Sequence, residues 1–198
     1  SCSTAAGVIE LGHASARRFD GGDERLLALM ADRAGLAVEH ARAYEHELST
    51  VEALQRSLLP DSLPRRERLQ IAARYMPGGA DVGGDWYDIT PLPDGRLFIC
   101  VGDVVGHGTP AVVTMGQLRH IIIGVAGLAN TPGEILDQMD LHCRRIPGAI
   151  ATTVWAGLVN PDRTELAYSS AGHPPALLTS AGRTTWLTGG LGPILGMQ

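Results

Sequence analysis

The sequence predicts an α+β domain of layered strands and helices, preceded by one long helix. Three observations carry this prediction. Apolar residues repeat in heptads between residues 23 and 59, short alternating runs bounded by Pro, Gly and Asp follow residue 60, and two apolar helical stretches interrupt those runs. Helices that are grouped, rather than alternating with every strand, are typical of α+β layers.

The N-terminal segment predicts a strand and then the start of a helix. Residues 4–12, TAAGVIELG, read as a short apolar strand followed by a polar turn. Asp20 is the expected helix cap, with Asp23 three residues later beside the positive end of the helix dipole. The chain starts at Ser1 rather than at Met and enters this strand directly. We therefore expect it to be cut from a longer protein.

The long helix predicted for residues 23–59 carries one apolar seam, and Pro60 ends it. Such a helix either lies against its own domain or pairs with a second copy as a parallel coiled coil, and the second alternative predicts a homodimer. The alanines in the seam favour a weak, adjustable pairing, as expected of a signalling connector. The seam consists of Leu27, Met30, Ala34, Ala37, Ala41, Tyr44, Leu48, Val51, Gln55 and Leu58.

Strands and helices are predicted along the rest of the chain. Strand patterns occupy residues 69–77, 84–91 and 96–103, and again 149–159, 165–172, 175–180 and 184–187. Between these groups, residues 109–129 are apolar on most faces, which predicts a helix packed between layers. A second helix begins at Thr131, because a cap, a proline and a capping-box glutamate follow one another there.

Composition excludes several classes of function. The net charge of −5 argues against a general nucleic-acid binder, and all 16 basic residues are arginine, which excludes a P-loop or Schiff-base lysine. The three cysteines form no Cys-x-x-Cys pair, so neither a zinc ribbon nor a disulfide framework is indicated. No apolar run approaches the ~20 residues of a membrane span. We expect a cytoplasmic protein that binds neither nucleic acid nor membrane.

Two aspartates lie at equal distances from one turn. Asp85 is nine residues before Asp94, and Asp103 is nine residues after it. In an antiparallel hairpin this spacing brings both carboxylates to the same level, about 5 Å apart. Two such carboxylates repel each other unless a cation lies between them, which favours Mg²⁺ or Mn²⁺ in surroundings rich in glycine. The alternative is that both aspartates only cap turns.

Four motifs resemble a known family. GGDWYD, GDVVGHG, LRHIII and SSAGHPPALL are similar, in this order, to the SpoIIE/RsbU-like branch of the PPM (type 2C) metal-dependent serine/threonine phosphatases. The likeness covers residues 52–198. Residues 1–48 resemble the last strand and terminal helix of a GAF sensor domain. The implied domains are a GAF-like end (1–22), a linker helix (23–59) and a partial phosphatase domain (60–198).

The resemblance implies a β-sandwich flanked by helices, with a binuclear Mn²⁺ or Mg²⁺ centre. Asp103 matches the aspartate that bridges the metals, the carbonyl of Val104 matches a further ligand, and Asp85 matches an aspartate at the metal centre. The implied reaction is hydrolysis of phosphoserine or phosphothreonine by metal-activated water. The implied substrate is a STAS-type anti-sigma factor antagonist.

One departure from the family limits this expectation. The later Thr-Asp-Gly loop and the final Asp-Asp or Asp-Asn motif of the family are absent from residues 1–198, so we expect truncation and little activity from these residues alone. The alternative is a non-catalytic regulatory binding module with the same fold. A nucleotide-binding glycine loop is disfavoured, because no G-x-G-x-x-G motif follows a strand.

Three other polar residues carry open interpretations. His107 either orients phosphate or holds its loop, and His173 is expected to fix a turn at the end of a strand. Asp88 either supports the site from behind or faces solvent.

Overall fold

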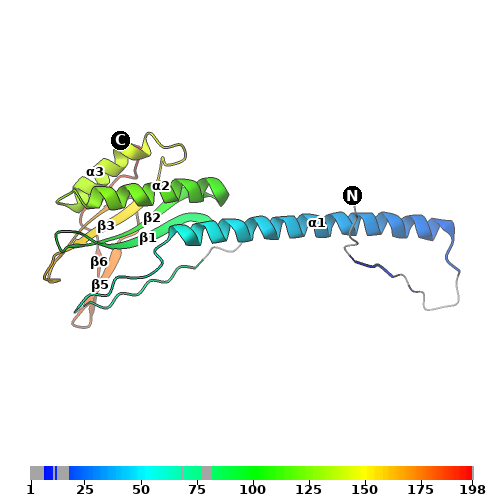
Figure 1. Ribbon diagram of the computed structural model, residues 1–198, viewed down its shortest axis with the longest axis horizontal. Coiled ribbons are helices and arrows are strands. Elements are labelled where there is room, and N and C mark those ends of the chain that lie inside the picture. Colours follow the sequence, from blue (N-terminus) through cyan, green and yellow to red (C-terminus); the bar gives the residue numbers. More distant parts are fainter. Residues whose placement is uncertain (1–6, 11, 13–17, 68, 77–81, 198) are drawn as a thin grey trace. The chain divides into compact units, whose positions relative to one another are not determined.

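The computed structural model describes residues 7–10, 12, 18–67, 69–76 and 82–197, which fall into two compact units, Ser1–Thr50 and Val51–Gln198. The second unit holds the strands and two of the three helices (Figure 1). This arrangement confirms the α+β class. None of the described helices is both long enough and apolar enough to cross a lipid bilayer.

Helix α1 (Gly21–Leu58) begins and ends where its sequence signals predict. Oδ1 of Asp20 accepts hydrogen bonds from the backbone N–H groups of Gly22 and Asp23, and Oδ2 of Asp23 accepts one from the N–H of Asp20. This reciprocal cap satisfies amide groups that have no partner within the first turn. The predicted strand 4–12 lies partly outside the described residues, and residues 7–10 form no strand.

The main sheet has five strands in the order β1-β2-β3-β4-β7. The strands are β1 (Gly83–Pro91), β2 (Leu97–His107), β3 (Thr153–Val159), β4 (Leu166–Ala171) and β7 (Leu191–Gly192). All neighbours are antiparallel except β4 and β7. A separate hairpin pairs β5 (Ala176–Ser180) with β6 (Arg183–Leu187). Among the described residues this hairpin is the second sheet, and its strands do not contact those of the main sheet.

Two helices cover one face of the main sheet (Figure 1). Helix α2 (Gly108–Ala126) contacts β1, β2 and α3 (Pro132–Cys143), and α3 also contacts β3 and β4. The core between these layers includes fully buried Phe98, Met115, Ile122 and Met139. The position of α2 between a sheet and a helix explains why its sequence is apolar on most faces.

The predicted strand 69–77 is wrong for its described part. Residues 70–76 pair with none of the described strands, and the one backbone bridge nearby joins Arg66 to Leu69. An alternating pattern needs a partner strand before it becomes a ladder, and sequence alternation alone cannot supply one. The two helices consequently follow the second strand of the sheet rather than the third.

Candidate functional site

The hairpin of β1 and β2 places Asp85 directly opposite Asp103 in register. The turn is centred on Asp94, and the left-handed backbone of Gly95 closes it with a hydrogen bond from its N–H to the carbonyl of Leu92. The equal spacing in the sequence is therefore reproduced as a cross-strand pair. Both side chains are on the exposed face of the sheet, opposite the helices.

The glycines next to the two aspartates serve close packing. A Cβ atom on Gly102 would lie 2.2 Å from the ring of Trp86, and one on Gly84 would lie 2.4 Å from the carbonyl oxygen of Val104. Packing against Trp86 and Val104, and not room for an ion, therefore requires glycine at positions 84 and 102. A β-bulge between Gly83 and Gly84 shifts the register at this end of the hairpin. The bulge redirects the backbone beside Asp85.

The two carboxylates influence each other electrostatically. Partial burial, the charge of Asp85 and a hydrogen bond with Asp85 together raise the pKa of Asp103. Two like charges this close disfavour each other's ionisation, and a divalent cation would relieve that repulsion. Carboxylate oxygens, such as those of Asp85 and Asp103, suit Mg²⁺ or Mn²⁺. The residues present therefore fit the expected ion.

The ligand set that these residues offer is partial. No group of three or more His, Cys, Asp or Glu side chains with metal-binding geometry occurs in the described part of the chain. Asp85 and Asp103 thus have no third side chain of these types placed to share a metal ion with them there.

Gln55, near the end of helix α1, contacts the strand that carries Asp85. The sequence predicts it only as a member of the heptad seam. Within the second unit, Gln55 is 1% exposed, and its Nε2 donates hydrogen bonds to the carbonyls of Gly83 (2.7 Å) and Asp85 (3.5 Å). A buried amide held by backbone carbonyls fixes the strand on which Asp85 lies. A polar residue at an apolar heptad position was the available signal for this role. Val51 is also buried in this unit, and Leu58 contacts Gly116 of α2.

Asp88 lies on the opposite face of β1 from Asp85, so it does not line the acidic pair. It is buried, its Oδ2 is 2.5 Å from a terminal nitrogen of Arg119 in α2, and Thr90 donates a hydrogen bond to its Oδ1. Oδ2 of Asp88 and Nε of Arg119 have no partner with hydrogen-bond geometry among the described residues. The attraction is therefore mainly one of charge, and the pair ties α2 to the strand that carries the site.

Two histidines lie near the same end of the sheet. His107 is exposed at the end of β2 and occupies the N-cap position of α2. Nδ1 of His173, between β4 and β5, is 2.8 Å from Oγ1 of Thr153, and Thr153 is the register partner of Asp103. His173 is thus fixed at a turn, as expected. Thr153 was not singled out from the sequence.

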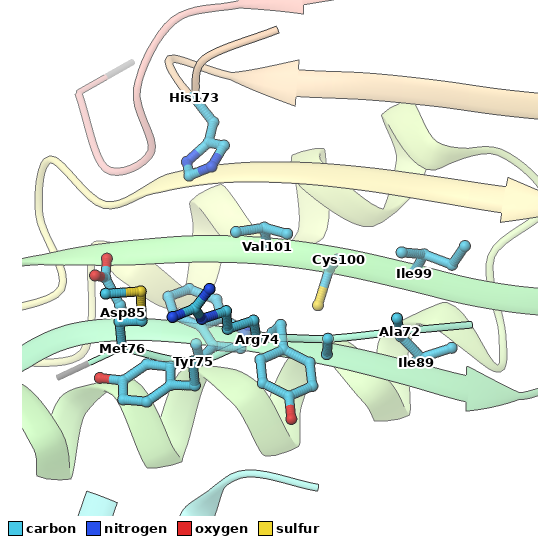
Figure 2. Close-up of a pocket in the computed structure, with 13 residues that line it drawn as sticks. Ala72, Arg74, Tyr75, Met76, Asp85, Ile89, Ile99, Cys100, Val101 and His173 are labelled. Atoms are coloured by element: carbon cyan, nitrogen blue, oxygen red, sulfur yellow. The ribbon is translucent and has the colours of Figure 1, made fainter. Parts of the chain in front are cut away.

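A cavity of about 520 Å³ opens beside Asp85 on the exposed face of the hairpin (Figure 2). Apolar side chains of β1 and β2 form its floor, and residues 72–76 border it. His173, from the connection between β4 and β5, also lines it. Burial, followed by the charge of Asp85, raises the pKa of Tyr75 in this wall. The cavity gives a ligand access to Asp85.

Comparisons with known proteins agree with this architecture. The family model described as Stage II sporulation protein E (SpoIIE) matches residues 93–198, more than half of the chain. The chain is 24% identical over 135 residues to phosphoserine phosphatase RsbU of Bacillus subtilis and 23% identical over 159 residues to phosphoserine phosphatase RsbP of the same organism. These matches cover 68% and 77% of this chain but only 40% and 39% of the relatives.

Solved structures show the same fold. The SiaA-PP2C domain of Pseudomonas aeruginosa superposes with a TM-score of 0.64 at 24% identity, over 81% of this chain and 65% of that one. A structure of RsbU and RsbW domains from Mycobacterium tuberculosis gives a TM-score of 0.53 at 36% identity, over 58% of this chain and 32% of that one. Together with the family model and the sheet that carries Asp85 and Asp103, these likenesses show that the chain belongs to the SpoIIE family and has a PP2C-like fold.

Proposed function

We propose that this chain carries part of the active site of a metal-dependent protein serine/threonine phosphatase. The observation that carries the proposal is the register pair of Asp85 and Asp103 in a member of the SpoIIE family. The names of the relatives RsbU and RsbP, both phosphoserine phosphatases, support the reaction class.

Asp85, Asp103 and the carbonyl of Val104 would hold Mn²⁺ or Mg²⁺, in a centre of two ions as the family resemblance implies. Such ions supply a nucleophilic water at neutral pH and neutralise charge on the phosphate. Residues of this chain would hold the two carboxylates in position. The hairpin holds both carboxylates at one level, Gln55 fixes the strand of Asp85, and the Asp88–Arg119 pair anchors the same strand to α2. A preorganised site of this kind has little reorganisation to undergo when its ligands bind.

We further propose that the substrate is a phosphoserine or phosphothreonine on a STAS-type anti-sigma factor antagonist. Residues 1–22 would end a GAF-like sensor domain, the helix over residues 23–59 would pair two copies, and residues 60–198 would hold the phosphatase part. Seam residues Met30 and Tyr44 are 51% and 53% exposed, which supports a surface able to meet a second copy.

The second candidate is a non-catalytic binding module with the same fold. The observation that favours it is the partial ligand set, since the described residues bring together two carboxylates and no third acidic neighbour. A module of this kind would bind its phosphoprotein partner without releasing phosphate.

Phosphate release from a phosphoserine-containing STAS protein, measured with and without Mn²⁺, separates the two candidates. The natural full-length protein should hydrolyse the ester only with the metal, and Asp103→Asn should abolish release. Asp137→Asn, an exposed carboxylate on α3, is the matched control and should leave release unchanged. Binding without any metal-dependent release by the full-length protein would favour the module.

The 198-residue chain gives a complementary measurement. Calorimetric titration should detect Mn²⁺ binding to this chain and its loss in Asp103→Asn, even where turnover is low. Equal Mn²⁺ affinity in wild type and Asp103→Asn would contradict the assignment of this residue.

A further inference from the structure

The acidic pair continues into a row of four side chains across the sheet. Asp85 of β1 faces Asp103 of β2, Asp103 faces Thr153 of β3, and Oγ1 of Thr153 is 2.8 Å from Nδ1 of His173. We call Asp85, Asp103, Thr153 and His173 the site row. Three neighbouring strands and the β4–β5 connection thus bring an imidazole to the end of the sheet that carries the carboxylates.

The backbone around His173 is held on both sides. The hydroxyl of Ser170, itself 1% exposed, donates to the carbonyl of His173 at 2.9 Å. The N–H of Gly172 donates to the carbonyl of Gly192 at 3.0 Å, and Gly172 also forms a parallel bridge with Val154. Gly172 has a left-handed backbone conformation, and a Cβ atom at this position would lie 2.1 Å from Cγ2 of Ile194, so no other residue fits here. His173 is therefore fixed before any ligand arrives.

The ring of His173 faces the same open space as Asp85. Both residues line the cavity on the exposed face of the hairpin (Figure 2). The contact with Thr153 uses Nδ1, so Nε2 is the ring nitrogen that can meet a ligand. Burial lowers the pKa of His173 more than the charge of Asp85 raises it, which favours the neutral imidazole. In the tautomer in which the Thr153 hydroxyl donates to Nδ1, Nε2 carries the proton and is a donor.

A hydrogen-bond donor beside the acidic pair would add a direct contact to a phosphate ester held there by a cation. Among the described residues that line the cavity, Arg74 and His173 are the two with basic side chains. Arg74 is exposed on a segment without a ladder partner, whereas His173 is half-buried and fixed. A donor that is already oriented loses less conformational entropy on binding.

We propose that His173 is a substrate-contacting residue whose Nε2–H donates to a phosphate oxygen of the ester bound beside Asp85 and Asp103, and that Thr153 is a positioning residue that sets its tautomer and direction. This inference rests on the proposed function and deepens it. It gives the site row one end that binds cations and one end that binds phosphate.

Histidine-ring ¹⁵N NMR of the Mg²⁺-loaded chain tests the inference, with inorganic phosphate and phosphoserine as separate probes. Both probes should shift Nε2 of His173. His173→Gln should weaken phosphate binding about tenfold at unchanged Mg²⁺ affinity. Thr153→Val should disturb the tautomer of His173 and weaken phosphate binding, and Thr153→Ser should restore both. His142→Gln, on α3, is the matched histidine control.

The possible failures are distinguishable. Unchanged phosphate affinity in both His173→Gln and Thr153→Val, with Mg²⁺ and phosphate binding lost in Asp103→Asn, would overturn the inference and leave the proposed function standing. A shift with inorganic phosphate alone would overturn the assignment to substrate. A wild-type chain that binds neither Mg²⁺ nor phosphate would overturn both the inference and the proposed function. Thr153→Val keeps the test decisive if His173→Gln does not fold.

Discussion

Breaking the ion pair between Asp88 and Arg119 should strongly destabilise the domain. The Asp88 side chain is 2% exposed and that of Arg119 is 14% exposed, with 2.5 Å between the charged atoms. Two unit charges about 4 Å apart attract by about 4 kcal/mol at an effective dielectric of about 20. Removing one partner of a buried pair costs about 3–5 kcal/mol, because the other charge stays buried without compensation.

Asp88→Asn keeps the shape of the side chain and removes its charge, so it isolates this effect. We expect the free energy of unfolding to fall by about 3 kcal/mol or more, a large share of the ~5–15 kcal/mol typical of a domain. Arg119→Met should cost a similar amount. The double variant should cost less than the sum of the two single changes, since neither charge is then left alone.

Urea denaturation followed by far-UV circular dichroism measures these free energies. Asp137→Asn on the exposed side of α3 is the control and should change stability by less than about 0.5 kcal/mol. Losses below about 1 kcal/mol in both single variants, or strict additivity in the double variant, would refute the reasoning. Either result would mean that water or other groups compensate the charges.

Three further changes have defined outcomes. Gly102→Ala should cost about 1–3 kcal/mol in the same urea assay, because the new methyl group meets the buried ring of Trp86; unchanged stability would show that the ring can move. In the native chain Cys100 and Cys143 should resist iodoacetamide at neutral pH and react in urea, as mapped by mass spectrometry; both are 0% exposed, and burial raises the pKa of Cys143 to about 11. The pKa of Asp103 is raised in the folded chain, so ionisation of this residue disfavours folding as pH rises. Asp103→Asn should therefore raise the melting temperature of the metal-free chain slightly at pH 7, whereas Mg²⁺ should stabilise only the wild type.

Local signals in the sequence predicted the elements that depend on neighbouring residues. The reciprocal cap of Asp20 and Asp23, the stop before Pro60 and the start of α3 all involve contacts within a few residues. The pairing of Asp85 with Asp103 also followed from sequence, because a tight hairpin fixes register by counting from the turn.

Contacts between residues that are far apart in the sequence could not be predicted by counting from a turn. Gln55 meets the strand of Asp85 across 30 positions of the chain, and Thr153 reaches His173 across 20. The sequence allows Asp88 either a buried or an exposed role, since the alternation of β1 shows its face but not that Arg119 of α2 contacts it. The strand predicted for residues 70–76 is wrong for the same reason, because no local pattern shows whether a segment pairs with another strand.

The alternation of β1 explains how one short motif serves both the site and the core. In GGDWYD, Asp85 and Tyr87 point to the cavity side, while Trp86 and Asp88 are 1% exposed on the side that α2 covers. Trp86 requires Gly102 opposite it, and Asp88 requires Arg119. A slip of one residue would bury the Asp85 carboxylate and expose the tryptophan, so the core contacts themselves hold the register. If Asp85 and Asp103 bind a divalent cation as proposed, variants that weaken the buried contacts should lose cation affinity together with stability, although none of the altered residues is a proposed ligand.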